Sequence, residues 1–382
     1  MSKALRIFFR ILLGLIFIAS GLMKLSDPIG LEWRMQEILL WLDLDFFYDI
    51  ILYPAIIFGI IELIVGVNLL LKAAIKTSSV FALVLSGFIV IANAGYYFAG
   101  ISYQEIDPVF NLWDIDTLRA LLVSVGIFLF AIVVFLGRKS ITTVWSRKGA
   151  FFLSVLLTSA GIFWVIYSSF HLPPFSYGKW KIGTQTGNLV IPIPEISEPC
   201  FVYKNNETGV TDTILIKDFT SSGVWKDSIW IMNHEFIDRD KQVTREYVEA
   251  PIPGFLIQNV FNDDKTADIL LNPEPNFLVV SYNVEEASIS GFRKINEFAR
   301  EAEMYGVATQ GITSTLFQPI DYFRHENQIV FEIYHVGNPL MLKEMVHANP
   351  GVILLKAGRI IKKWHYYELP PFTKVKETYL NN

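Results

Sequence analysis

Five long apolar runs constrain this chain more than any other feature of its sequence. Each is long enough to cross a hydrocarbon core of about 30 Å, which takes roughly 20 helical residues. Only 18% of the residues are charged, where soluble domains have roughly 25%. The sequence therefore predicts an α-helical membrane part with five transmembrane helices, at residues 7–25, 50–71, 80–100, 118–137 and 150–170.

The charges between these runs alternate in sign, which predicts their orientation. Basic residues gather at the N-terminus and in the second and fourth connections, whereas the first and third connections are acidic. Because basic residues favour the cytoplasmic side, the N-terminus is predicted to be cytoplasmic and everything after residue 170 to lie outside. Cleavage of the first run as a signal peptide is not expected, since four further spans continue the alternation. The basic residues are Lys3, Arg6, Arg10, Lys72, Lys76, Arg138, Lys139, Arg147 and Lys148; the acidic ones include Asp27, Glu32, Glu37, Glu105, Asp107, Asp114 and Asp116.

Net charge and cysteine content exclude several classes of function. The formal net charge of −5 over 382 residues argues against nucleic acid as a partner, because phosphate binding needs a concentrated basic face. The sole cysteine, Cys200, excludes an internal disulfide and a C-x-x-C redox centre. It begins a predicted strand, where a buried thiol is expected. Five of the six histidines are scattered along the chain without the spacing of zinc ligands, so no metal site is predicted. They are His234, His325, His335, His347 and His365.

Polar residues inside the apolar runs mark a candidate intramembrane site. Glu62 lies in the middle of the second run, too deep to reach the interface, and such residues usually face a bundle interior or a cavity. One interpretation is a carboxyl hydrogen-bonded to a neighbouring helix, holding the bundle together. The other is a small-molecule or proton-linked site. The candidate residues are Glu62, Asn68, Asn93, Arg10 and Lys24.

Two stretches of the membrane part resemble a known family. Arg10-Ile-Leu-Leu-Gly14, followed by Phe17-Ile-Ala-Ser20-Gly21-Leu-Met-Lys24-Leu-Ser-Asp27-Pro28, resembles the opening signature of the DoxX family of bacterial membrane proteins. Glu62-Leu-Ile-Val-Gly66 resembles the glutamate-and-glycine pattern in that family's second helix.

The DoxX resemblance implies a four-helix membrane domain over residues 1–140, with 141–172 as an added fifth transmembrane helix. It also implies a multi-pass protein of the bacterial inner membrane with a periplasmic C-terminal part. Relatives are linked to quinone-connected oxidation, so a quinone at Glu62 is one expectation. Close relatives carry a cysteine pair in the loop before the fourth helix, but the matching loop 101–117 contains none.

Residues 173–250 are predicted to form a linker followed by a small β-rich subdomain. Strands at 201–203 and 213–216 flank Asn205-Asn-Glu-Thr-Gly209, which is typical of a hairpin. Residues 228–232 are also predicted to be a strand.

From residue 251 the chain alternates strand and helix, which is typical of an α/β fold. Gly306 is placed to end the first helix, and residues 356–358 to turn a final hairpin. Strands are expected at 276–282, 307–313, 329–334 and along the hairpin 349–364; helices are expected at 290–305, 316–323, 339–348 and 373–380.

This order resembles the thioredoxin-like fold, so residues 251–382 are expected to form a soluble thioredoxin-like domain. Asn349-Pro350, two apolar strands and Lys362-Lys363-Trp364 carry the resemblance, which implies a cis peptide bond at Pro350. The family's redox pair belongs in the turn 283–288, which contains no cysteine. Thiol–disulfide exchange by this domain is therefore excluded, since a thiolate must attack. What remains is a predicted partner-binding groove formed by Glu285, Glu286, Ser288, Asn349 and Pro350.

Together these patterns predict a non-catalytic inner-membrane protein without a cofactor. Its redox-inactive periplasmic domain is expected to dock other proteins of a cell-envelope complex, and its helices to contact membrane lipids. The alternative is a quinone-linked oxidoreductase subunit that works with a separate cysteine-containing protein. A transporter or proton-coupled carrier is a third interpretation, which draws on Glu62 alone.

Overall fold

The computed structural model describes residues 3–48, 50–99, 116–174 and 178–380, except for the side chains of Lys3 and of a few residues between 33 and 45. The acidic residues Glu105, Asp107 and Asp114 lie outside the described residues. The chain divides into two compact units, one comprising residues 1–186 and 255–382 and the other residues 187–254.

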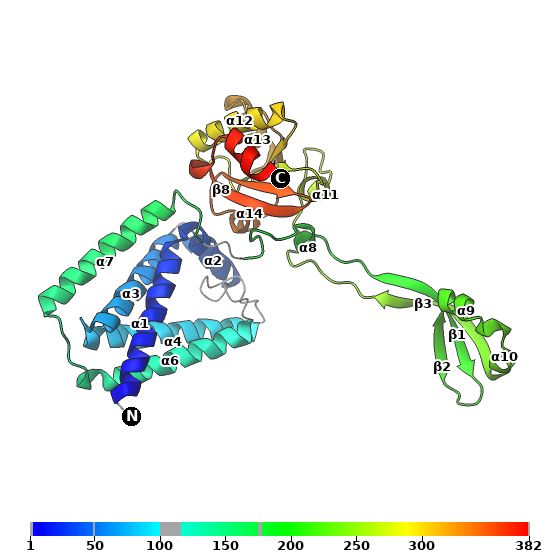
Figure 1. The fold of residues 1–382 in the computed structure, drawn as a ribbon, viewed down its shortest axis with the longest axis horizontal. Coiled ribbons are helices and arrows are strands. Elements are labelled where there is room, and N and C mark those ends of the chain that lie inside the picture. Colours follow the sequence, from blue (N-terminus) through cyan, green and yellow to red (C-terminus); the bar gives the residue numbers. More distant parts are fainter. Residues whose placement is uncertain (1–2, 49, 100–115, 175–177, 381–382) are drawn as a thin grey trace. The chain divides into compact units, whose positions relative to one another are not determined.

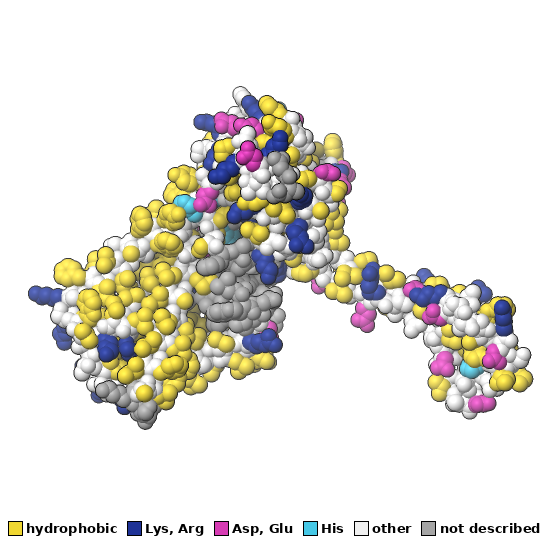
Figure 2. Space-filling view, in the orientation of Figure 1, with side chains coloured by type: hydrophobic (Ala, Val, Ile, Leu, Met, Phe, Trp, Pro, Cys, Tyr) yellow, Lys and Arg dark blue, Asp and Glu magenta, His cyan; other side chains and the backbone are white. Residues whose placement is uncertain are grey.

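Five helices of the described chain are long and apolar enough to cross a membrane, so the chain is a multi-pass membrane protein. This confirms the five predicted spans, although the third span, α4, starts five residues before its apolar run. Large apolar side chains are exposed along these helices, and Figure 2 shows hydrophobic side chains covering them. The helices are α1 (Lys3–Leu25), α3 (Leu52–Leu71), α4 (Ile75–Ala99), α6 (Thr117–Gly137) and α7 (Arg147–Ser168).

The membrane helices pack chiefly as two pairs, α1 with α3 and α4 with α6. One buried cluster joins the pairs and contains Leu13 and Phe17 of α1, Leu69 of α3, Leu85 of α4 and Val134 of α6. Its residues come from four of the five helices, so these four share one apolar core.

A helix absent from our sequence prediction, α2 (Pro28–Trp41), follows α1 directly. We expected this region to be an acidic loop. The helix forms because Asp27 accepts a hydrogen bond from the Gly30 N–H at 3.0 Å, while Pro28 occupies the first turn, where its missing N–H is harmless. Leu31 and Leu39 then bury one side of the helix.

The smaller unit is built on a three-stranded antiparallel sheet in the order β2-β1-β3 (Figure 1). The predicted hairpin is confirmed: β1 and β2 flank the turn at residues 206–210. Cys200 on β1 is buried and unpaired, as predicted. The strands are β1 (Ile196–Asn205), β2 (Thr211–Leu215) and β3 (His234–Arg245); the short helices are α8 (Gly187–Val190), α9 (Ile216–Ser222) and α10 (Ser228–Asn233).

The predicted strand at residues 228–232 is wrong, because these residues form α10. Asp227 caps this helix by accepting hydrogen bonds from the N–H groups of Ile229 and Trp230. Trp230 packs edge-on against Tyr203 of β1, with ring centroids 4.8 Å apart. A local cap and one aromatic contact therefore override the alternating apolar pattern.

The larger unit continues after residue 255 into an α/β region with a five-stranded sheet in the order β6-β5-β4-β7-β8. β4, β5 and β6 run parallel, and β7 and β8 are antiparallel to their neighbours. The strands are β4 (Asn276–Ser281), β5 (Ala308–Thr313), β6 (Ile333–His335), β7 (Gly351–Lys356) and β8 (Arg359–His365); the helices are α11 (Thr266–Leu270), α12 (Ile289–Met304), α13 (Phe317–Glu326), α14 (Pro339–Met345) and α15 (Phe372–Val375).

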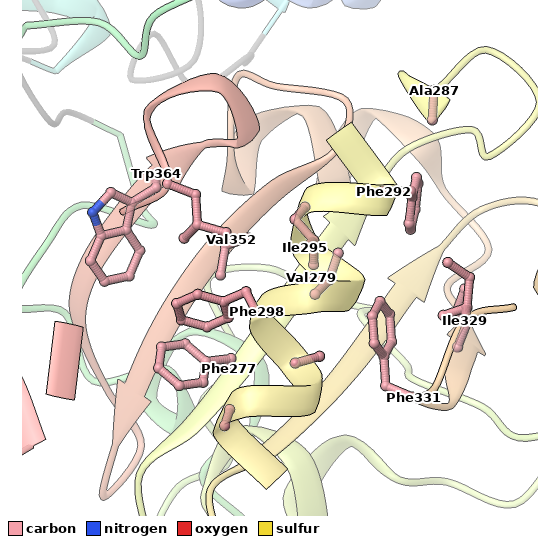
Figure 3. Packing of buried hydrophobic residues seen from close by; sticks show 14 of the residues in the cluster. Phe277, Val279, Ala287, Phe292, Ile295, Phe298, Ile329, Phe331, Val352 and Trp364 are labelled. Carbon is pink, nitrogen blue, oxygen red and sulfur yellow. The ribbon is translucent and has the colours of Figure 1, made fainter. Parts of the chain in front are cut away.

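The core of the α/β region lies between this sheet and α12 (Figure 3). Phe277 and Val352 from the sheet meet Ile295 and Phe298 from the helix, and every residue of β4 is buried. Gly306 ends the first long helix of the region with φ +72°, as predicted. The final predicted helix is also present, as α15 and a π-helical turn Lys376–Leu380.

Two predicted elements of this region are shorter than expected. The strand predicted at 329–334 pairs only at Ile333–His335, because the Val330 N–H donates instead to Asn296 of α12 at 2.8 Å. The helix predicted at 339–348 ends at Met345, since Val346 is extended.

Residues 178–186 belong to the α/β region and not to a free linker. Gly183 N–H donates to Ile360 O at 2.7 Å, and Thr186 N–H donates to Gly358 O at 2.8 Å, both beside β8. Trp180 is fully buried and its ring lies 5.2 Å from that of Phe255. The smaller unit at 187–254 is thus inserted between two segments of the larger one.

Candidate functional site

The candidate intramembrane site lies where α1 and α3 cross at close range. A Cβ atom at Gly21 would lie 2.7 Å from the Gly59 carbonyl oxygen, and one at Gly66 would lie 2.7 Å from that of Gly14. Small residues let helix backbones approach where lipid gives no hydrophobic drive for association. These four glycines therefore bring polar side chains of the two helices within bonding distance.

Lys24 of α1 and Glu62 of α3 form an ion pair at this crossing. Lys24 Nζ lies 2.9 Å from Glu62 Oε1 and 2.8 Å from Oε2. Ser20, one turn before Lys24 on the same helix face, donates to Glu62 Oε2 at 2.8 Å and accepts from Lys24 Nζ at 2.8 Å. Glu62 is fully buried. Each charge therefore has an opposite charge and a hydroxyl as partners, which offsets the cost of burying it in the membrane.

Arg10 does not join this ion pair but binds the carboxyl-terminal end of α3. Its guanidinium donates to the Leu69 carbonyl and, at 3.0 Å, to the Leu70 carbonyl. Carbonyl groups in the last turn of a helix have no partner within the helix, and a cation there also interacts favourably with the helix dipole. Arg10 therefore caps α3 from α1, although it is buried like the ion pair.

Asn68 and Asn93 are both buried but occupy other positions. Asn68 lies near the end of α3 and lines a cleft to which α4 and α7 also contribute. Asn93 lies on α4, which packs mainly along α6, and its Nδ2 has no hydrogen-bond partner among the described residues. Of the five predicted residues, the structure brings Lys24 and Glu62 into direct contact.

The predicted partner groove holds a compact set of hydrogen bonds in the α/β region. The Asn349–Pro350 peptide bond is cis, as the resemblance implied. Ser288 caps α12 through the Gly291 N–H, and its own N–H donates to the Asn349 carbonyl at 3.1 Å. Pro350 is buried, and a Cβ atom at Gly291 would lie 3.2 Å from its ring and 2.7 Å from the ring of Tyr366.

Glu285 and Glu286 are the exposed members of the predicted groove. Glu285 lines a surface cleft of about 410 Å³ between the start of α12 and α13. Ile289 and Tyr322, which also line it, are 56% and 70% exposed, and Glu326 adds a second carboxylate. The open surface next to the groove is thus apolar with an acidic rim.

Polar contacts that the sequence did not predict join the α1–α2 region to the α/β region. His347 Nδ1 lies 2.8 Å from Asp27 Oδ1, and Lys343 of α14 donates to Gln36 of α2 at 3.0 Å. Asp27 could have been recognised as a helix cap from the Asp27-Pro28 pair. His347 carries no local signal, because its partner lies 320 positions away in the chain.

Two basic groups of β8 have perturbed pKa values. Burial lowers the pKa of Lys363 to about 7, although the negative charge of Glu344 acts to raise it. The Nζ of Lys363 donates to the Met345 carbonyl at 2.7 Å. Burial also lowers the pKa of His365 to about 4, with a smaller contribution from His171. The cause is the same in both cases, since loss of water disfavours the charged form.

The described residues contain no group of three His, Cys, Asp or Glu side chains that could hold a metal ion. No family model matches the sequence, and neither a curated protein nor a solved structure matches the chain.

Proposed function

We propose that the chain is a non-catalytic membrane anchor whose α/β domain docks partner proteins in a cell-envelope complex. The proposal includes a DoxX-like membrane domain, a thioredoxin-like domain and a location in the bacterial inner membrane with the α/β domain in the periplasm. The sheet order, the cis bond at Pro350 and the final β-hairpin followed by a helix support the thioredoxin-like assignment.

The turn where a thioredoxin-like protein carries its thiol pair is filled here by hydrogen-bonded polar groups. Asn283 accepts from the Glu285 N–H at 3.0 Å and donates to Glu286 at 2.9 Å. Asn349 donates to the Asn283 carbonyl and accepts from Ser281. Cys200, the sole cysteine, is buried in the other unit. These contacts support a fold retained for binding after its redox chemistry is lost.

The cleft beside this turn carries the docking proposal. Ile289 and Tyr322 expose apolar surface, while Glu285 and Glu326 place two carboxylates at its edge. A few side chains, Tyr prominent among them, supply most of the energy of protein contacts, and rim charges help to select the partner. The partner is therefore an extended protein segment that carries apolar side chains flanked by Lys or Arg.

The quinone alternative receives less support. Both carboxylate oxygens of Glu62 accept hydrogen bonds from Lys24, so this carboxylate is engaged within the protein. Purification from native membranes followed by mass spectrometry of bound small molecules tests it directly. Stoichiometric quinone would favour the alternative over the docking proposal.

Photo-crosslinking in native membranes tests docking at the cleft. A photoreactive phenylalanine at Tyr322 should give a defined crosslinked protein, whereas the same probe at Met304, at the far end of α12, should not. The Glu285→Lys/Glu326→Lys variant should lose the crosslink. The control Glu301→Lys/Glu303→Lys makes the same charge change on the exposed C-terminal part of α12 and should keep it. Equal crosslinking from Tyr322 and Met304, or no crosslinked protein, would contradict the proposal.

A further inference from the structure

One end of the membrane helices contains a cleft of about 800 Å³ that the proposed function does not use. Residues of α3, of the turn into α4, and of the first turns of α7 line it. The Val144 N–H donates to the Lys72 carbonyl at 3.1 Å, which ties the segment before α7 to the α3–α4 turn. The C-terminal end of α3 and the N-terminal ends of α4 and α7 therefore form the cleft, and this backbone hydrogen bond links the segment before α7 to the other two.

The outer end of this cleft is positively charged. Lys76 and Arg147 line it, and both side chains are exposed. α4 begins at Ile75 and α7 at Arg147, so the first turns of two long helices meet the same space. Helix N-termini carry partial positive charge and N–H groups that have no partner within the helix, although at α7 the Ser146 hydroxyl already accepts from the Gly149 N–H. Side chains and backbone thus favour an anion here.

The inner end of the cleft is apolar. Ile61 and Ile64 of α3 line it together with Phe81 of α4 and Phe151 of α7. Ile61 lies ten positions before the end of α3, which at 1.5 Å per residue is about 15 Å deeper in the helix bundle. A ligand that fills the cleft must therefore combine an anionic end with a long apolar part.

Asn68 gives independent evidence that the cleft takes a ligand. Its side chain lines the cleft, the residue is only 3% exposed, and its Oδ1 has no hydrogen-bond partner among the described residues. A buried acceptor without a donor is costly. A hydroxyl group on the polar end of the ligand would supply that donor, since Asn68 lies only three positions before the end of α3.

We propose that this cleft binds an anionic phospholipid whose headgroup carries hydroxyl groups. Lys76 and Arg147 receive its phosphate, Asn68 accepts a hydrogen bond from the headgroup, and the acyl chains lie along Ile61, Ile64 and Phe151. A free phosphate ion would satisfy the cationic end alone and leave the apolar wall uncovered. The lipid thereby fills the space between α3, α4 and α7.

Native mass spectrometry of the full chain in detergent tests the proposal with defined lipids. Phosphatidylglycerol should bind, and phosphatidylcholine should bind at least tenfold more weakly. Lys76→Gln/Arg147→Gln should weaken phosphatidylglycerol binding about tenfold or more, given that each interfacial basic residue contributes roughly one tenfold step in affinity or slightly less. Lys139→Gln/Lys148→Gln removes the same charge from exposed residues that do not line the cleft and should leave binding unchanged.

Phosphatidylmethanol, which is anionic but has no headgroup hydroxyl, tests the role of Asn68. The unmodified chain should prefer phosphatidylglycerol, and Asn68→Leu should bind the two lipids equally while it keeps the fold, as judged by circular dichroism. Equal binding of phosphatidylcholine, or an equal loss in both double variants, would overturn the proposal. Displacement of the lipid by inorganic phosphate would instead identify a soluble-anion site.

Discussion

Lys24 Nζ on α1 lies 2.8 Å from Glu62 Oε2 on α3, and both side chains are buried in the membrane part of the chain. Ser20 completes the arrangement by bonding to both. The backbones of the two helices approach closely at Gly21 and Gly59, so the pair lies beside one of the two close contacts of the crossing. We interpret it as the polar contact that fixes how α1 and α3 are aligned.

Glu62→Gln should destabilise the protein by about 3 to 5 kcal/mol, because it leaves the Lys24 ammonium group buried without its counter-charge. The double variant Lys24→Met/Glu62→Leu should recover most of this loss, since it removes both charges. Thermal unfolding in detergent compares the stability of the unmodified chain, Glu62→Gln and the double variant. A double variant that is no better than Glu62→Gln would argue for a role of the carboxylate beyond pairing.

The contact at Gly21 should tolerate no larger side chain. Gly21→Leu places atoms against the Gly59 carbonyl and the Leu63 backbone, and overpacking of this kind costs about 1 to 3 kcal/mol. Gly95→Leu on α4 is the matched control, because a Cβ there meets nothing within 4 Å. The melting temperature should fall for the first variant and stay within a few degrees for the second.

The contact between Asp27 and His347 is testable by crosslinking. In a Cys200→Ser background, Asp27→Cys/His347→Cys should react with a short bifunctional thiol reagent to give an intramolecular crosslink, because the two side chains meet at 2.8 Å. The pair Asp27→Cys/Met304→Cys is the control and should not crosslink, since the contact of Asp27 in the α/β region is with His347, whereas Met304 is an accessible residue at the C-terminal end of α12. Proteolysis between the sites followed by electrophoresis reports the bond. Efficient crosslinking of the control pair alone would show that the α/β region sits differently on the membrane helices.

The stability of the protein should fall as the pH drops from about 6.5 towards 4. His365 is 2% exposed, and burial lowers its pKa from 6.5 to about 4 in the folded state. The unfolded chain therefore binds the proton first as the pH falls, so acid favours unfolding through this group, by a few kcal/mol at most. The effect is absent above pH 7, where the residue is neutral in both states.

His365→Asn separates titration from hydrogen bonding. The Asn side chain retains an acceptor for the Tyr367 N–H, which now bonds to His365 Nδ1 at 3.1 Å, but it does not titrate. The variant should lose less stability than the unmodified chain between pH 7 and pH 5 in thermal unfolding. His325→Asn on the exposed side of α13 is the control. Identical pH profiles for all three proteins would exclude His365 as a source of the acid sensitivity.

Much of the secondary structure follows from local patterns. The five spans are set by uninterrupted apolar length, and the turn at 356–358 between β7 and β8 by its glycine. The cis bond at Pro350 was expected only from family resemblance. The errors occur where a neighbouring group supplies a cap or a hydrogen bond: Asp27 starts α2, Asp227 turns a predicted strand into α10, and Asn296 takes the N–H that a longer β6 would have used.

By itself, the sequence determined which segments enter the membrane and that a partner is needed there for Glu62, because local composition sets the cost of placing an unpartnered backbone or charge in hydrocarbon. Tertiary structure alone decided which partner each polar group has. It joined Lys24 to Glu62 and used Arg10 as a cap, although both cations lie on the same helix. It also joined Asp27 to His347, 320 positions apart, and left Asn68 at a cleft formed by three helices. Such pairings depend on how helices cross, and one-dimensional patterns of hydrophobicity and charge do not encode the crossing.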